Sequence, residues 1–354
     1  MSRRPRARKR SGPTPARRLA VGLGSAVATL GVILALLAAW AVWSYAGPGP
    51  TAKAGTDTTV ILRRGAGVSE IANALSRAGV VRSPSVFLAA AQFTGAAKAL
   101  KAGEYKFASR ASMRAVLDAI RHGRVVRHQV TIPEGWTSEM AAEALAREPA
   151  LTGAAPAPPE GSILPDTYQF ERGEDRAAVM KRMMDAQDEL LATLWARRQP
   201  GLPFRTPDEA VTLASVVEKE TALPSERPRI AAVFLNRLRS GMRLESDPTI
   251  IYGLTHGRPL GRGIRLSELT GQTPYNTYVV DGLPPTPICN PGRASLAAVL
   301  DPPKSSELFF VADGSGGHVF ASTFEEHKRN VEKWRSVEKT RAAQATTAEL
   351  KPAR

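Results

Sequence analysis

Apolar residues form one long run near the N-terminus and then recur at the spacings of short helices and strands. Residues 19–46 carry no charged side chain. At about 1.5 Å per residue, a helix of this length crosses the roughly 30 Å hydrocarbon layer of a membrane. A cleaved signal peptide has a shorter apolar region of about 7–15 residues, so the pattern favours a single uncleaved transmembrane helix. Trp40, Trp43 and Tyr45 cluster at its far end, where aromatic rings favour the membrane interface.

The residues that follow predict a linker and a small module. Residues 47–56 are rich in Gly and Pro and indicate a short flexible linker. In the next segment, 57–131, the patterns predict a strand, two helices and a strand, followed by a further helix and a strand at 125–132. This β-α-α-β order resembles the LysM glycan-binding module. A spacer that holds the next domain away from the membrane explains the same pattern equally well.

A larger domain is predicted at 132–335. It shows several helical patterns, a β-hairpin signal at 307–322 and a last helix that begins with a capping box of Thr323 and Glu326. Residues 336–354 lack a periodic apolar face and are expected to form a flexible tail. The predicted fold class is therefore α+β, with one N-terminal transmembrane helix, a LysM-like subdomain and an α+β catalytic domain.

Charge placement assigns a side of the membrane to each end of the chain. The 354 residues include 48 Lys and Arg against 33 Asp and Glu, a net charge of +15. Nine of the basic residues and no acid lie within 1–56, and eight of the nine precede the apolar run. Such a basic arm, residues 1–18, is expected to stay in the cytoplasm, which places the rest outside the plasma membrane. The other 298 residues carry +6 without an obvious block, which argues against a nucleic-acid-binding protein.

The usual catalytic and metal-binding motifs are missing from the exported sequence. It has no zinc-binding His-Glu-x-x-His helix, no Gly-x-Ser-x-Gly elbow and no phosphate-binding loop. Cys289 is the single cysteine, and His256, His318 and His327 lack the spacing of metal ligands. We therefore expect neither a metal nor a cofactor, and the remaining candidate chemistry is that of carboxylates.

Two glutamates near the end of one predicted helix are the strongest candidates. Thr206, Pro207 and Glu209 start this helix with a capping box. The helical period places both Glu218 and Glu220 near the edge of the apolar stripe, where partial burial raises a carboxyl pKa. The periodicity does not choose between them.

Seven segments, in order, carry a resemblance to a known family. They are Glu160-Gly-Ser-Ile-Leu-Pro-Asp-Thr-Tyr-Gln-Phe170, Ala214-Ser-Val-Val-Glu-Lys-Glu-Thr221, Val233-Phe-Leu-Asn-Arg-Leu238, Leu244-Glu-Ser-Asp-Pro-Thr-Ile-Ile-Tyr-Gly253, Pro274-Tyr-Asn-Thr-Tyr278, Gly282-Leu-Pro-Pro-Thr-Pro-Ile-Cys-Asn-Pro-Gly292, and 309–320. This series resembles the endolytic murein transglycosylases of the YceG-like family. The resemblance covers residues 57–334 and places the membrane anchor where the family has it.

The resemblance implies a function and a set of site residues. It implies non-hydrolytic cleavage of the β-1,4 bond between N-acetylmuramic acid and N-acetylglucosamine in peptidoglycan glycan strands, leaving 1,6-anhydro ends. It implies that the catalytic acid is the first glutamate of the Glu-Lys-Glu-Thr element, Glu218. It also suggests work near peptidoglycan synthases, as a terminator of new strands. The candidates for substrate binding are Ser246, Asp247, Tyr252, Asn276, Tyr278 and Asn290.

Each of these side chains also has a purely structural interpretation. A glutamate at a helix end, or an aspartate beside a turn, commonly serves the backbone alone. The alternative to an enzyme is a non-catalytic scaffold that binds peptidoglycan through the LysM-like module.

Overall fold

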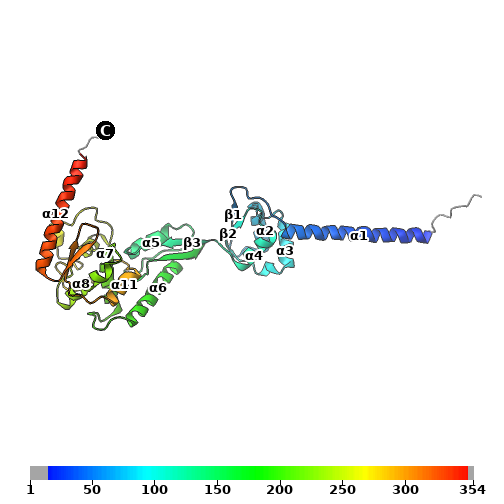
Figure 1. Ribbon diagram of the computed structural model, residues 1–354. Helices are drawn as coiled ribbons and strands as arrows, with labels where there is room; N and C mark the ends of the chain where they lie inside the picture. The colour runs from blue at the N-terminus through cyan, green and yellow to red at the C-terminus, as the bar shows by residue number, and fades with distance from the viewer. Residues whose placement is uncertain (1–14, 350–354) are drawn as a thin grey trace, which may run out of the picture. The chain divides into compact units, whose positions relative to one another are not determined.

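The computed structural model describes residues 15–349, which divide after Val126 into two compact units, and the first unit begins with a long N-terminal helix (Figure 1). The predicted basic arm at 1–18 lies almost entirely outside the described residues. Helix α1 runs from Pro15 to Ala46. Among the described residues it contains the one segment long and apolar enough to cross a membrane, Val27–Ala46.

The first unit contains a two-stranded antiparallel sheet covered by three helices. Strand β1 (Asp57–Leu62) pairs with β2 (Gly103–Ala108). The helices are α2 (Val68–Arg77), α3 (Pro84–Phe93) and α4 (Met113–His122), and a short 3₁₀ turn, η1, spans Ala96–Lys98. The predicted strand–helix–helix–strand order is therefore present.

Buried and exposed side chains alternate along β1, and the buried ones form part of this unit's core. Val60 and Leu62 are buried beneath the helices, whereas Ile61 between them is 53% exposed on the opposite face of the sheet. Tyr105 and Phe87 are fully buried in the same core.

Two boundaries of the first unit differ from the sequence prediction. The segment 47–56, expected to be a flexible linker, is hydrogen-bonded to the unit: Gly49 N–H donates to the carbonyl of Arg110, and Arg110 N–H donates to that of Pro50. The strand expected at the end of the module is β3 (Arg127–Thr131), which pairs antiparallel with β4 (Thr167–Glu171) in the second unit. The paired residues of β3 and β4 are 36–44 positions apart in the sequence. Local periodicity does not reveal such a pairing, and for this reason the sequence prediction assigns β3 to the first unit instead of the second.

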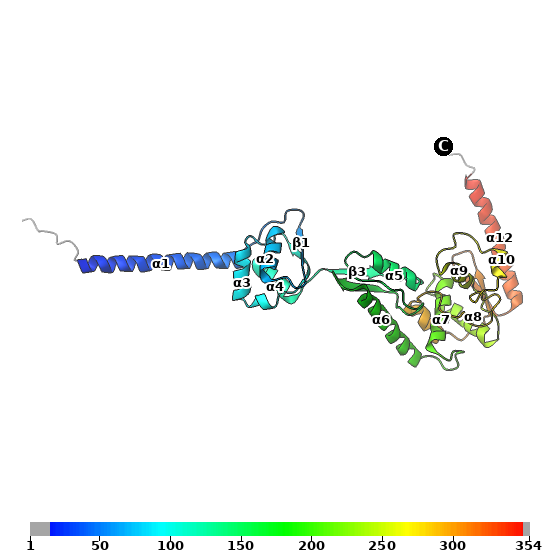
Figure 2. The same ribbon diagram turned by 180° about the vertical axis from the view of Figure 1, so that it is seen from behind.

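In the second unit, several helices pack around one central helix. Within its described residues, β3 pairs antiparallel with β4, and β5 (Phe309–Ala312) pairs antiparallel with β6 (His318–Ala321). Figure 2 shows β3 between α5 and α6. The helices are α5 (Ser138–Arg147), α6 (Arg176–Ala196), α7 (Pro207–Glu220), α8 (Arg227–Arg239), α9 (Asp247–Thr255), α10 (Leu266–Leu269), α11 (Arg293–Leu300) and α12 (Phe324–Glu349).

Helix α7 is the centre of this unit's core. The predicted capping box of Thr206 and Glu209 is confirmed, but every residue from Ala210 to Glu218 is buried. The sequence suggested a single apolar stripe. Helices α6, α8, α9 and α11 instead pack around α7, and a helix enclosed on all sides has no solvent face.

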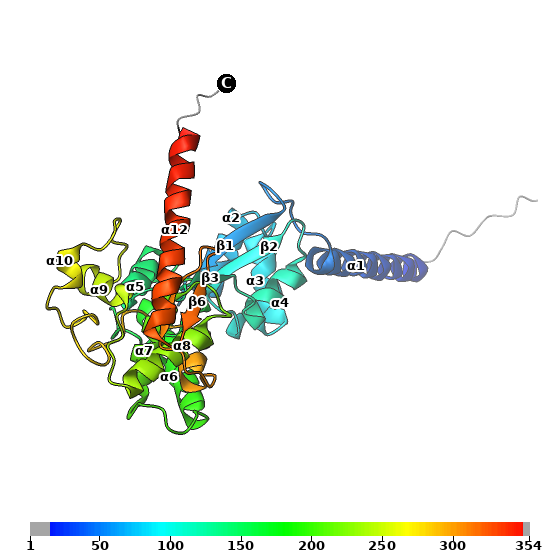
Figure 3. The ribbon, with the colours of Figure 1, turned by 60° about the vertical axis from the view of Figure 1, so that its left-hand side comes forward.

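The C-terminal helix is longer than expected. Thr323 and Glu326 form the predicted capping box, with each backbone N–H donating to the other's side chain. Helix α12 continues to Glu349, through residues for which the sequence indicated a flexible tail (Figure 3).

Candidate active site

The two glutamates of the Glu-Lys-Glu element lie in different surroundings. The Glu218 side chain is only 4% exposed. Arg227 Nη2 donates to its Oε1 at 3.0 Å, while Gly292 N–H and Ser295 Oγ donate to its Oε2 at 2.9 and 2.7 Å. Arg227 also reaches Glu134 at 3.1 Å. Both oxygens of Glu218 are thus engaged inside the protein.

These contacts give Glu218 a structural task. Gly292 is the N-cap of α11 and Ser295 lies in its first turn. A helix N-terminus carries unpaired N–H groups and partial positive charge, which a carboxylate stabilises. Because Arg227 comes from α8, the carboxylate joins three helices in the core.

Glu220 is the last residue of α7 and is half-buried. Its Oε1 accepts a hydrogen bond from Ser246 Oγ. Burial raises the pKa of Glu220 to about 7, and the hydrogen bond from Ser246 partly opposes this rise. The negative charge of Asp247 adds to the increase, whereas His318 and Arg237 act against it. A carboxyl group with this pKa can both give and accept a proton near neutral pH.

Three of the predicted binding residues lie around Glu220. Ser246 precedes α9 and Asp247 is its first residue. Tyr278 Oη donates to Asp247 Oδ1 at 2.7 Å, and burial raises the Tyr278 pKa so that its hydroxyl stays protonated. Glu220, Ser246, Asp247 and Tyr278 are called the Glu220 cluster below.

Tyr252 belongs to a second polar group. Its hydroxyl donates to Glu160 Oε2 at 3.4 Å, and burial raises the pKa of Glu160. Ser138 also binds Glu160, through its N–H at 2.8 Å and its Oγ at 3.2 Å. A pocket of about 230 Å³ opens here, lined by Thr137, Ser138, Glu139, Ala157, Pro158, Glu160, Tyr252 and His256. Sequence reasoning did not select Glu160, although it is the first residue of a family-like segment and lies in the repeated Pro-Glu-Gly turn.

The two predicted asparagines do not lie where a glycan could reach them. Asn276 and Asn290 are fully buried. The Asn276 amide donates to three backbone carbonyls of the 268–271 segment. The Asn290 amide donates to the carbonyl of Trp136 and accepts from the N–H of Ile163. Their expected role in direct substrate contact is therefore corrected to one of holding loops in place.

The described residues offer no obvious ligand set for a metal. Within residues 15–349, no group of three or more His, Cys, Asp and Glu side chains is arranged to hold an ion. Cys289 is buried and its Sγ lies 3.3 Å from the carbonyl of Ser215. Burial raises the pKa of this thiol well above its usual value, so it remains protonated and a poor nucleophile.

Comparison with known proteins identifies relatives over most of the chain. A model of the YceG-like family matches residues 60–333. A Streptococcus pneumoniae protein named endolytic murein transglycosylase is 30% identical over 323 residues, covering 77% of this chain and 57% of that protein. A Bacillus subtilis protein of the same name is 27% identical, with 79% and 85% covered. The crystal structure of a YceG-like protein from Listeria monocytogenes matches with a TM-score of 0.50 at 27% identity, covering 77% of this chain and 98% of that one. The chain thus spans just over half the length of its S. pneumoniae relative.

Proposed function

The chain belongs to the YceG-like family, and on that premise we propose that it is an endolytic lytic transglycosylase acting on peptidoglycan. The names of the S. pneumoniae and B. subtilis relatives support this activity. The proposed reaction cleaves the β-1,4 bond between N-acetylmuramic acid and N-acetylglucosamine and leaves a 1,6-anhydro end.

Glu220 is the proposed acid, in place of the Glu218 that the resemblance implied. The observation that carries this choice is the contrast between their surroundings. Glu218 is enclosed and holds Arg227 and the start of α11, so protonating it would break an internal network. Glu220 is half-buried, has a pKa raised to about 7 and lies beside hydroxyl and carboxyl groups suited to sugars.

One carboxyl group is sufficient for this chemistry. Glycosidases ordinarily need two carboxyl groups, because the second activates water or acts as the nucleophile. Here protonated Glu220 gives its proton to the glycosidic oxygen as the bond from C1 breaks. The C6 hydroxyl of the same muramic acid then closes onto C1 and returns a proton to the Glu220 carboxylate. Intramolecular attack supplies an effective concentration that a separate water molecule lacks.

The neighbours of Glu220 provide the proposed sugar contacts. Ser246 orients the Glu220 carboxyl, while Asp247 and Tyr278 offer an acceptor and an aromatic hydroxyl. Tyr252 and Glu160 provide a second polar surface at their pocket, with a hydroxyl and a carboxyl group that can hydrogen-bond a sugar. Asn276 and Asn290 act indirectly, through the loops that they hold.

The proposal includes a location and a role in the cell. Helix α1 anchors the chain in the plasma membrane with its N-terminus in the cytoplasm, so the second unit works on the outer side. The first unit serves as a LysM-like module or as a spacer. Acting beside peptidoglycan synthases, the enzyme would end the growth of new strands.

Product analysis tests this function directly. Purified full-length chain is incubated with uncrosslinked glycan strands, and the products are examined by mass spectrometry. Transglycosylation yields ends that are lighter by one water than hydrolytic ends. Glu220→Gln abolishes them if the proposal holds. Wild-type protein that binds strands without producing new ends supports the scaffold alternative instead.

A further inference from the structure

The positive charge outside the N-terminal arm is concentrated in the first unit. Residues 57–126 contain eleven Lys and Arg against four Asp and Glu, a net charge of +7. Residues 127–354 contain 28 basic and 29 acidic side chains, a net charge of −1. The sequence prediction of an even spread is therefore corrected. The small unit beside the membrane helix is basic and the larger unit is not.

The membrane helix is joined closely to this basic unit. Beyond Ala46 the chain is fixed by the hydrogen bonds between Gly49, Pro50 and Arg110. Ala52 N–H also donates to Ser109 Oγ at 3.0 Å. Because this connection is short and hydrogen-bonded, the unit is held close to the end of α1. One of its surfaces therefore faces the point where α1 would leave the hydrocarbon layer.

That surface is formed by α3, an uncharged helix. Figures 1 and 2, seen from opposite sides, both place α3 on the side of the unit next to the end of α1. Its sequence, Pro84–Phe93, contains no Asp, Glu, Lys or Arg. Phe87 and Ala91 point into the core, whereas the Phe93 side chain, at the end of the helix, is 95% exposed. A single exposed aromatic ring is common on protein surfaces, but one that lies on an uncharged helix beside the end of a membrane-spanning helix is placed where such rings enter the membrane interface.

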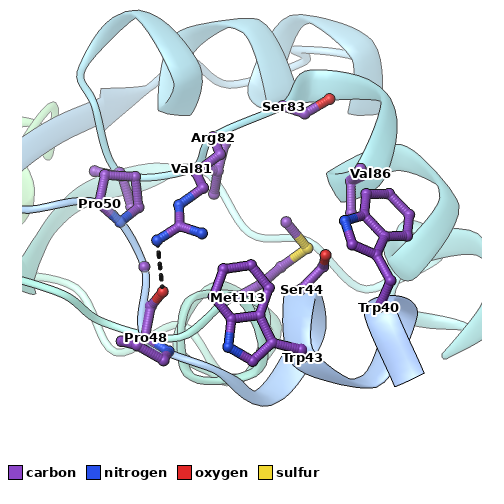
Figure 4. A pocket seen from close by; sticks show the side chains of 12 residues that line it. Trp40, Trp43, Ser44, Pro48, Pro50, Val81, Arg82, Ser83, Val86 and Met113 are labelled. Atoms are coloured by element: carbon purple, nitrogen blue, oxygen red, sulfur yellow. Dashed lines mark hydrogen bonds between the residues drawn. The ribbon is translucent and has the colours of Figure 1, made fainter. Parts of the chain in front are cut away.

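A pocket of about 210 Å³ lies beside the end of α1, and residues 48–50, the segment before α3 with Val86, and Met113 of α4 complete its lining. Figure 4 shows Trp40 beside Val86 at one end and Arg82 beside Pro48 at the other. The Arg82 guanidinium lies 4.9 Å from the centre of the Trp43 ring and donates to the Pro48 carbonyl at 3.2 Å. This one carbonyl uses one of the five N–H donors of the guanidinium. The pocket combines tryptophan rings with a cation at the end of the apolar segment Val27–Ala46, where a membrane-spanning helix would meet lipid headgroups.

We infer that the first unit lies on the outer surface of the membrane and binds anionic phospholipid, with Phe93 entering the interface and Arg82 contacting a headgroup phosphate. The basic charge of the unit complements such a surface, and near it each Lys or Arg strengthens association about fivefold. This inference rests on the proposed membrane anchor but not on the proposed chemistry.

A fluorescent label at position 93 tests the inference. Phe93→Cys in the full-length chain is labelled with nitrobenzoxadiazole, while the native Cys289 is buried. The protein is inserted into nanodiscs of phosphatidylcholine, with or without phosphatidylglycerol, that contain a nitroxide lipid. The matched control is Ile61→Cys, an exposed apolar position on the face of the sheet away from the helices.

The expected result is blue-shifted emission and strong nitroxide quenching at position 93 and little of either at position 61. Phosphatidylglycerol should increase the quenching at 93. Arg82→Gln should remove that increase, whereas Arg63→Gln, an exposed arginine beyond β1, should leave it.

Three results would overturn the inference. Equal quenching at positions 93 and 61 shows that α3 does not face lipid. A response at 93 to soluble glycan strands, without lipid quenching, shows that the unit binds glycan instead. A chain that fails to enter nanodiscs removes the anchor itself. Loss of the proposed enzyme activity affects none of these readouts, so the two failures are distinguishable.

Discussion

Replacing each glutamate of the Glu-Lys-Glu element separately should have two different effects: one variant should lose stability and the other should lose catalytic activity. Glu218→Gln removes the charge that faces Arg227 inside the core, where the two side chains are 4% and 11% exposed. One glutamine oxygen can still accept from Gly292 or Ser295. Its amide N–H₂ then faces the guanidinium, donor against donor. We expect this variant to be destabilised and to keep its chemistry.

The magnitude of this destabilisation follows from the pair. Breaking a buried ion pair by removing one partner costs about 3–5 kcal/mol. Arg227 keeps Glu134 at 3.1 Å, and the Glu134 side chain is 42% exposed. We therefore expect a value near the lower end, about 3 kcal/mol. For a unit of this size, that corresponds to a melting temperature roughly 6–12 °C lower.

Glu220→Gln should behave in the opposite way. Its pKa in the folded protein is about 7, above the usual value for a carboxyl group. The folded state therefore holds this proton more tightly than the unfolded state, and stability falls as pH rises through the interval between the two values. Glutamine cannot ionise, so the stability advantage of the variant over the wild type should be small at pH 5 and larger at pH 8. After allowance for solvent screening of this half-buried side chain, the gain is on the order of 1 kcal/mol.

The assay measures melting and product formation on the same samples. Thermal melts of the full-length chain in detergent are recorded at pH 5 and pH 8, and anhydro ends are counted at a temperature where every variant is folded. Glu220→Gln should lose activity by about 10²–10⁴-fold, the usual contribution of a general acid. The reasoning is refuted if Glu218→Gln is inactive with an unchanged melting temperature, or if Glu220→Gln stays active.

Three further predictions concern pH and the loops. Initial rates of anhydro-end formation should fall above about pH 7, because the reaction starts from protonated Glu220. Ser246→Ala should move this fall to higher pH, since it removes a hydrogen bond that lowers the Glu220 pKa; the control Ser295→Ala should leave the pH profile in place and lower the melting temperature. Asn276→Ala leaves three backbone carbonyls without their donor and should destabilise the protein by about 2–3 kcal/mol in thermal melts, with activity lost only as folding is lost.

Local sequence signals predicted the elements well where their causes are local. The capping box at Thr206 and the strand–helix–helix–strand order of the first unit depend on residues a few positions apart. The true end of that unit depends on β3 pairing with β4, which lies 36–44 residues further along the chain. Periodicity within a strand does not identify the strand it pairs with, so the prediction placed the boundary after β3, and the structure places it before β3.

The candidate site was predicted in part for the same reason. The family resemblance pointed to Ser246, Asp247 and Tyr278 as polar residues in its matching segments, and the fold brings them to Glu220. The sequence alone, however, does not distinguish an asparagine that binds a sugar from one that hydrogen-bonds the backbone of a loop. Only the burial of Asn276 and Asn290 assigns them to the protein interior.

The choice between the two glutamates depends on where the surrounding helices stop. Residues two apart on a helix point about 200° apart, so Glu218 and Glu220 face opposite directions from α7. While other helices enclose α7, a carboxylate there requires internal partners, and Arg227 with the start of α11 provides them. Beyond that point α7 ends, and Glu220 lies at the margin of the core, partly desolvated but accessible. The same residue type is therefore enclosed by internal partners in one position and lies at the margin of the core in the other, and the end of the helix accounts for the difference.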